Sequence, residues 1–254
     1  MGVVENIRIA KENGRILKES RYSVGNKTYE FDLSFLNRSV VVSQFNELKM
    51  VKNLSRYHVR DNIHNKNSID MILELRKNGE KGNIIALNFA NAIAPGGGYL
   101  YGAVAQEECL CRSSLLYSAI SKHRWYYLKD ALKYTPYAKQ EMIYSPNVPI
   151  IRDGEYQFIP YTEASFVTSC AVNVTILKCL TLGLYSRKRV KKVMENRIRD
   201  LFALMLDQNP SVIVLGAWGC GAYGNDREEI YDLFEEVINE CIPHDEMKII
   251  FAVV

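Results

Sequence analysis

Apolar and polar positions along the chain predict strands and helices that follow one another in turn. Short, continuously apolar runs such as 83–87 and 212–215 are typical of strands that are buried on both faces of a sheet. Longer stretches with apolar residues at helical spacing, such as 185–206 and 227–241, predict amphipathic helices. This alternation indicates an α/β protein with helices on both faces of its sheet.

The first third of the chain has a more mixed pattern. Residues 5–20 carry apolar side chains at helical spacing, and 22–33 predict a hairpin or an extended arm. Residues 68–77 predict a helix, for which Ser68 is the expected N-cap. The segment 46–66 shows no clear period, and we interpret it as a mobile loop or a family-specific insertion.

The middle of the chain is rich in β-type residues. Four short strands are expected, within 143–146, 148–152, 156–160 and 166–172. Before them, residues 120–142 interleave aromatic and basic side chains. Such a stretch can bind nucleic acid, but it is more often the half-buried face of an ordinary helix, which is the interpretation we favour.

One stretch, 88–117, concentrates the candidate chemistry. Consecutive glycines let the backbone approach a ligand closely, and adjacent carboxylates beyond such a loop can face that ligand and supply a proton. The alternative is a solvated helix start, where glutamate is favoured by the helix dipole; for an isolated short motif this is the commoner case. The residues concerned are Gly96, Gly97 and Gly98, then Gln106, Glu107 and Glu108.

A second glycine-rich loop separates the strand 212–215 from the helix 227–241. It contains a G-x-G-x-x-G motif, but a dinucleotide-binding fold needs further βα units after that motif, and a single strand follows here. A glycine loop that enters a helix still presents amide donors and a positive dipole end to a diphosphate. We favour this cradle over a plain tight turn. Its residues are Gly219, Cys220, Gly221, Ala222 and Tyr223.

The pattern as a whole resembles the microbial-type poly(ADP-ribose) glycohydrolases, a branch of the macrodomain fold. Their signature is three glycines, a short spacer and Gln-Glu-Glu, and here seven residues separate Gly98 from Gln106. The flanking segments 88–91 and 111–114 fit, as do 143–153 and 215–226. The resemblance therefore runs from about residue 9 to the C-terminus.

The resemblance implies a macrodomain-like three-layer α/β/α sandwich with a mixed central sheet. Residues 1–254 would form a single domain, with 1–38 as an N-terminal extension packed on it. The implied activity is cleavage of ribose–ribose O-glycosidic bonds in poly(ADP-ribose), in exo fashion, with ADP-ribose as product. Glu108 would be the general acid and later the base, through an oxocarbenium-like transition state, and Glu107 would hold ribose hydroxyls.

Several substrate contacts are also implied by the resemblance. Asn91 would bind the distal ribose, Gln106 would orient the acids or the ribose, and the second glycine loop would hold the diphosphate. Tyr223 stands where phenylalanine is common, and its extra hydroxyl should be tolerable if it points toward water. Partial burial beside another acid should raise the pKa of one carboxyl of the pair. The family's usual proline is absent at Val172, so we expect looser geometry on the adenosine side.

Two other functions remain open on the same fold. One is a reader module that binds ADP-ribose, and the other is a hydrolase that removes mono-ADP-ribose from protein or nucleic acid. A reader has no need of an acid, so the intact pair Glu107 and Glu108 favours an enzyme. The residues do not separate the polymer from mono-ADP-ribosyl substrates, because one acid can protonate several leaving groups.

The composition of the chain excludes some classes of protein and ligand but does not by itself indicate a function. The hydrophobic share of 48% and charged share of 24% are those of an ordinary globular protein. A net charge of +3 is too small to indicate direct binding of nucleic acid. The six cysteines and four histidines lack metal-ligand spacing, so we expect reduced thiols and neither a metal nor a cofactor.

The sequence also guides expectations about location and partners. Neither a signal peptide nor a long apolar span is present, so we expect a cytoplasmic protein without membrane contacts. The expected partners are poly(ADP-ribose) or ADP-ribosylated protein, and we expect a monomer.

Overall fold

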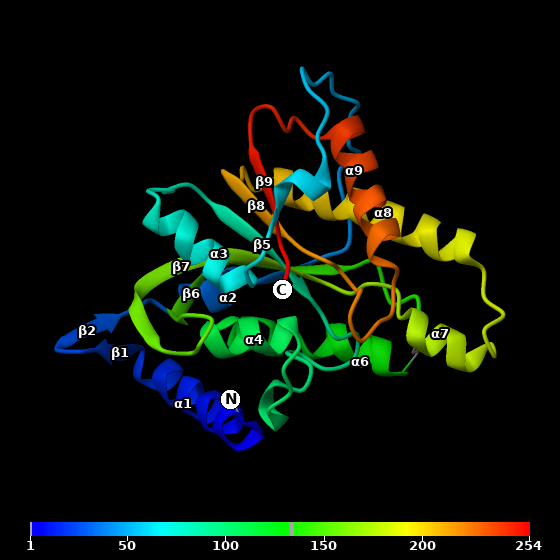
Figure 1. Ribbon diagram of the computed structural model, residues 1–254. Helices are drawn as coiled ribbons and strands as arrows, with labels where there is room; N and C mark the ends of the chain where they lie inside the picture. The colour runs from blue at the N-terminus through cyan, green and yellow to red at the C-terminus, as the bar shows by residue number, and fades with distance from the viewer. Residues whose placement is uncertain (1, 133–134) are drawn as a thin grey trace.

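A mixed β-sheet organises the computed structural model, which describes residues 2–132 and 135–254 (Figure 1). Within these residues the sheet has seven strands in the order β3-β6-β7-β5-β8-β9-β4, and a separate hairpin pairs β1 with β2. Helices lie on both faces of the larger sheet (Figure 1). The α/β class with a mixed central sheet, expected from the sequence, is confirmed.

The central strand is β5 (Ile84–Phe89). It pairs in parallel with β7 (Phe158–Ser169) on one side and with β8 (Val212–Leu215) on the other. Beyond β8 the sheet continues in parallel through β9 (Lys248–Ala252) to β4 (Ile63–His64). The carboxyl ends of these five strands therefore meet at one edge of the sheet.

The other half of the sheet is antiparallel. Strand β6 (Met142–Arg152) pairs with β3 (Val40–Val42) and with β7. The expectation of four short strands in this region is wrong, because the pieces join into two long ones. The register shifts between Ser145 and Val148, and such a bulge lets the strand continue past Pro146.

Alternate side chains of β5 pack into two separate hydrophobic cores, one on each face of the sheet. Ile84 and Ala86 belong to one buried cluster, while Ile85 and Leu87 belong to the other. This is the period-two alternation of a strand covered on both faces. The first cluster includes side chains of α1 (Val3–Glu19), α3 (Ser68–Lys77), α4 (Gln106–Ser113), α5 (Leu116–Ser121) and α6 (Arg124–Leu132).

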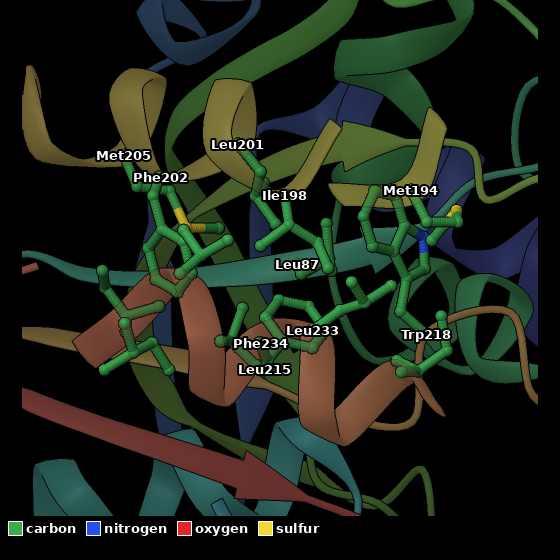
Figure 2. Close-up of a cluster of buried hydrophobic side chains, with 14 of the residues drawn as sticks. Leu87, Met194, Ile198, Leu201, Phe202, Met205, Leu215, Trp218, Leu233 and Phe234 are labelled. Carbon is green, nitrogen blue, oxygen red and sulfur yellow. The ribbon is translucent and has the colours of Figure 1, made fainter. Parts of the chain in front are cut away.

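The second core lies against the long C-terminal helices. Figure 2 shows Leu87 of β5 and Leu215 of β8 between side chains of α8 (Arg187–Leu206) and those of α9 (Arg227–Cys241). Trp218, which follows β8, is fully buried in the same cluster. The apolar period of both helices was visible in the sequence, and both predicted helices are confirmed.

The N-terminal segment packs beside the signature helix. The expected helix and hairpin are present as α1, β1 (Arg21–Val24) and β2 (Lys27–Glu30), followed by α2 (Ser34–Arg38). Asn13 Nδ2 donates to the backbone oxygen of Arg112 at 2.8 Å, so α1 is tied to the end of α4. In Figure 1, α1 runs beneath α4.

Some elements differ from expectation. Residues 46–66 end in a 3-10 turn, η1 (Val59–Asn62), and in β4, which joins the sheet edge; the lack of regular structure expected there is wrong for these residues. The N-cap of α3 is Asn67 rather than Ser68, because Asn67 Oδ1 accepts from the Asp70 N–H at 2.9 Å. Helix α7 (Val174–Leu180) was not predicted.

The aromatic and basic stretch near residue 125 forms the helix α6. Tyr126 and Tyr127 are buried, and Trp125 is exposed. The interpretation as a half-buried helix face is therefore confirmed for the described residues. No described helix has the length and apolar character needed to cross a membrane.

Truncation of a buried side chain of β5 should measure how much its burial contributes to the free energy of unfolding. We expect Leu87→Ala to lower the free energy of unfolding by about 3 kcal/mol, because it removes a fully buried side chain and leaves a cavity. The control is Leu54→Ala, at a side chain that is 97% exposed. This variant should change the free energy of unfolding by less than about 0.5 kcal/mol. Urea denaturation checks both, and similar losses would contradict the core assignment.

Candidate active site

The loops at the carboxyl ends of β5, β7 and β8 surround a cavity of ≈ 450 Å³. Its lining includes Asn91 after β5, the first turn of α4 with Glu107 and Glu108, Ala171 after β7, and the second glycine loop. Ligands of open α/β sheets bind at this edge. A volume of this size is within the usual range for small-molecule sites.

Glu108 lies directly against the first glycine loop. Its Oε1 accepts a hydrogen bond from the Gly98 N–H at 2.8 Å. Gly97 has φ of +53°, and a Cβ placed on it would lie 2.5 Å from the same oxygen. The glycine is therefore required twice, by its backbone conformation and by the approach of the carboxylate. The second oxygen, Oε2, is buried and has no hydrogen-bond partner among the described residues.

Glu107 is the more deeply buried acid, with 2% of its surface exposed. Its Oε2 accepts from the backbone N–H of Asn91 at 2.7 Å, and its Oε1 accepts from Asn88 Nδ2 at 3.1 Å. Burial raises the pKa of Glu107 to about 8; the two hydrogen bonds act against this rise, and the charge of Glu108 adds to it. The sequence led us to expect a raised pKa as a requirement of the general acid; the rise is found at Glu107, whereas the resemblance assigns the acid role to Glu108.

Gln106 fixes the signature helix to the central strand. Its Oε1 accepts from the Phe89 N–H at 2.9 Å, and its Nε2 donates to the Leu87 oxygen at 2.9 Å. Nε2 also donates to Ser68 Oγ at 3.3 Å. Both ends of this amide are engaged with β5, so Gln106 positions the two glutamates that follow it.

Asn91 shapes the loop that leaves β5. Its Oδ1 accepts from the N–H groups of Ile93 and Ala94, each at 3.0 Å, in a local turn. Its Nδ2 has no hydrogen bond to the described residues, and Asn91 lines the cavity. The expected contact with a ribose therefore remains a prediction that this geometry permits.

The second glycine loop forms the opposite wall of the cavity. Gly219 has φ of +73°, and a Cβ there would lie 2.5 Å from the Cβ of Ala171. Asn225 Nδ2 braces the loop by donating to the Gly219 oxygen at 3.0 Å. Around Gly221 no atom lies within 4 Å of a Cβ position, so the backbone there is open to a ligand. The lining residues of this loop are Gly219, Cys220, Gly221, Ala222 and Tyr223.

The Tyr223 hydroxyl joins the two loops. It accepts from the Ala92 N–H at 3.3 Å and donates to the Ala90 oxygen at 3.4 Å. The hydroxyl therefore bonds to backbone groups of the loop after β5, and its accommodation does not depend on pointing toward water. A phenylalanine at this position would lack both bonds.

The position without the family's proline is well supported. Val172 is fully buried, and its N–H, which a proline would lack, donates to Met194 Sδ at 3.4 Å. Its oxygen accepts from Asn225 Nδ2 at 2.8 Å. The turn after β7 is thus held by hydrogen bonds and packing, and looser geometry there remains a prediction.

Comparison with known proteins agrees with this geometry. The family model of the microbial-type poly(ADP-ribose) glycohydrolase (PARG) catalytic domain matches residues 10–153, which include the whole first signature. The chain belongs to this family. No curated protein matches the sequence.

Two solved PARG structures extend the likeness beyond the matched segment. That of Thermomonospora curvata, bound to the inhibitor ADP-HPD, is 25% identical with a TM-score of 0.83 and covers 98% of this chain and 93% of its own. That of Deinococcus radiodurans, in complex with ADP-ribose, is 31% identical with a TM-score of 0.67, over 75% of this chain and 76% of its own. The first likeness covers nearly the whole chain and so extends well beyond the segment that the family model matches.

Some residues of the cavity were not found by sequence reasoning. Asn67, Ser68 and Ile69 line it at the start of α3, together with Val253 after β9 and Arg227 at the start of α9. No local motif marks them, because they reach the cavity only through the order of the parallel strands.

Gly97→Ala should test the contact between the first glycine loop and the helix α4. We expect ADP-ribose release to fall by about 100-fold, because the new Cβ would displace the Glu108 carboxylate and a small misplacement at the reacting centre is costly. Gly14→Ala, at an open position in α1, is the control and should retain activity. Release assays with folded variants check this, and retained activity in Gly97→Ala would contradict the contact.

The raised pKa of Glu107 predicts a pH dependence of stability. The folded state binds the proton more tightly than the unfolded state, so this contribution is fully present below the ordinary pKa of 4.5 and is lost as the pH rises through about 8. Its full size is up to about 5 kcal/mol. Thermal unfolding measured at pH 5 and at pH 8.5 should show a larger loss of stability at the higher pH for wild type than for Glu107→Gln. Equal losses in the two proteins would contradict the raised pKa of Glu107.

Proposed function

We propose that this chain hydrolyses the ribose–ribose O-glycosidic bonds of poly(ADP-ribose) and releases ADP-ribose from the end of the polymer. The observation that carries the proposal is the Glu108 carboxylate, held by the Gly98 N–H on one oxygen while the other has no hydrogen-bond partner in the described part of the chain. This carboxylate lines a cavity whose opposite wall is a glycine loop suited to a diphosphate. Membership of the PARG family supports the same reaction.

In the proposed reaction Glu108 acts first as an acid. It protonates the oxygen that leaves as the glycosidic bond breaks, and the ribose passes through an oxocarbenium-like transition state. The resulting carboxylate then takes a proton from water as the water oxygen bonds to the anomeric carbon. The proton returns to Glu108, so the residue ends the cycle as it began.

Glu107 is proposed to hold the ribose and to keep the loop in place. It anchors the backbone of Asn91, so a change at Glu107 would move the residue expected at the distal ribose. Because the two glutamates are adjacent in one helical turn, they are unlike the separated pair of most glycosidases. We assign the proton transfer to Glu108 alone.

The second glycine loop is proposed to hold the diphosphate through backbone N–H groups. The open approach to Gly221 supports this role. The Tyr223 ring would pack on the terminal ribose, with its hydroxyl keeping the loop at a fixed distance from Ala90. These contacts make ADP-ribose the expected product ligand, and polymer or ADP-ribosylated protein the expected partner. We propose that residues 1–254 act as one unit, as a monomer.

Conversion of the proposed acid to its amide should separate binding from catalysis. We expect Glu108→Gln to bind ADP-ribose with an affinity close to that of wild type and to release it from the polymer about 1,000-fold more slowly, the usual scale for losing a general acid. Calorimetry measures the first quantity and a release assay the second.

Glu30→Gln, at an exposed position of β2, removes the same charge far from the site and should retain full activity. If Glu108→Gln released ADP-ribose at the wild-type rate, the acid role would be lost. If wild type bound ADP-ribose without releasing it from the polymer, a reader or a hydrolase of another linkage would replace the proposal.

A further inference from the structure

A second cavity, of ≈ 250 Å³, adjoins the same glycine loop. Residues Gly219–Tyr223 line the first cavity, and the next residues, Gly224–Asp226, line the second. Its other walls come from α7, α8 and α9. Its floor is apolar and includes Val190, Met194, Ile230 and Leu233.

Three cationic and two acidic side chains line this second cavity. Lys178, Arg187 and Lys191 line it, and all three are exposed. None of the three has a carboxylate within ion-pair distance among the described residues, whereas the neighbouring Lys192 pairs with Glu195 at 3.2 Å. The acids of the lining are Asp226 and Glu229. Asp226 is occupied as the N-cap of α9, where it accepts from the Glu229 N–H at 3.0 Å.

The start of α8 breaks a local rule of helix electrostatics. The first turn contains no acidic residue, although the positive end of the helix dipole favours acids there. The first six residues instead hold five cations, and those in the first turn are destabilised by the dipole. Local rules are broken chiefly at functional sites, and a bound anion would remove the conflict. The five are Arg187, Lys188, Arg189, Lys191 and Lys192.

We propose that this cavity binds the diphosphate of a second ADP-ribose unit of the polymer, next to the unit held in the active site. The three cations, none of them ion-paired among the described residues, outnumber the two lining acids and can contact the two negative charges of a diphosphate. Tyr185, which also lines the cavity, offers a ring on which an adenine can stack. The inference rests on the proposed function and refines its substrate, since a polymer can present one diphosphate to each cavity at once.

The site makes a prediction about the Michaelis constant. In the triple variant Lys178→Gln, Arg187→Gln, Lys191→Gln we expect the KM for poly(ADP-ribose) to rise about 10-fold, because neutralised phosphate contacts are lost. The kcat and the Kd for free ADP-ribose should stay within about twofold of wild type, because the active site is untouched. The KM of the variant should also depend less steeply on salt concentration.

The matched control removes three exposed cations far from both cavities. This control is a triple variant on α1 and β1, with Lys11→Gln, Lys18→Gln and Arg21→Gln. It makes the same change in net charge and should leave the KM within about twofold of wild type. A KM that rises equally in the two triples would show a general charge effect and overturn the site. An unchanged KM in the first triple would overturn it as well.

A binding assay keeps the inference separate from the reaction. Glu108→Gln, with and without the first triple substitution, is titrated with labelled poly(ADP-ribose) while single-stranded RNA of equal charge competes. Weaker polymer binding in the combined variant supports the site even if wild type releases no ADP-ribose, an outcome that would defeat only the proposed reaction. Displacement by RNA as effective as by unlabelled polymer would assign the cavity to nucleic acid and defeat the inference.

Discussion

The contact between the Glu108 carboxylate and the backbone of Gly97 fixes the geometry on which the rest of the site depends. No side chain fits between the two, so the loop and the first turn of α4 can meet only at a glycine. Gln106 holds the same turn to β5, and Glu107 holds the loop through the Asn91 N–H. Three consecutive residues of one helix thus position the end of β5 and the loop that follows it.

The central strand β5 connects the position of the two glutamates to the packing of both hydrophobic cores. Because its side chains enter one cluster and the other alternately, β5 is held by helices on each face and shifts as a unit with them. Its last residues, Asn88 and Phe89, both bond to the signature helix. The position of the acids is therefore set by the packing of side chains far from the cavity.

Elements with a strong period could be predicted from the sequence, and so could the residues of the two glycine loops. The helix 227–241 was found to the residue, because its apolar stripe is uninterrupted. The strands β6 and β7 were divided into pieces, since proline and polar residues hide a bulged pairing that only the partner strand explains. The Tyr223 hydroxyl could not be placed, because its acceptor at Ala90 lies over 130 positions away in sequence. The burial behind the pKa of Glu107 likewise depends on long-range packing.

The strand order also bears on how the protein is made. Ile85 pairs with Ser165 on one side and with Ile213 on the other, so a ribosome that has just completed the signature has made neither partner of β5. Until both are synthesised, β5 presents two unpaired edges and two apolar faces to the cell, a combination prone to aggregation. The strand that leads into the signature is thus exposed longest before its partners exist, and the site can form only after the last strands have entered the sheet.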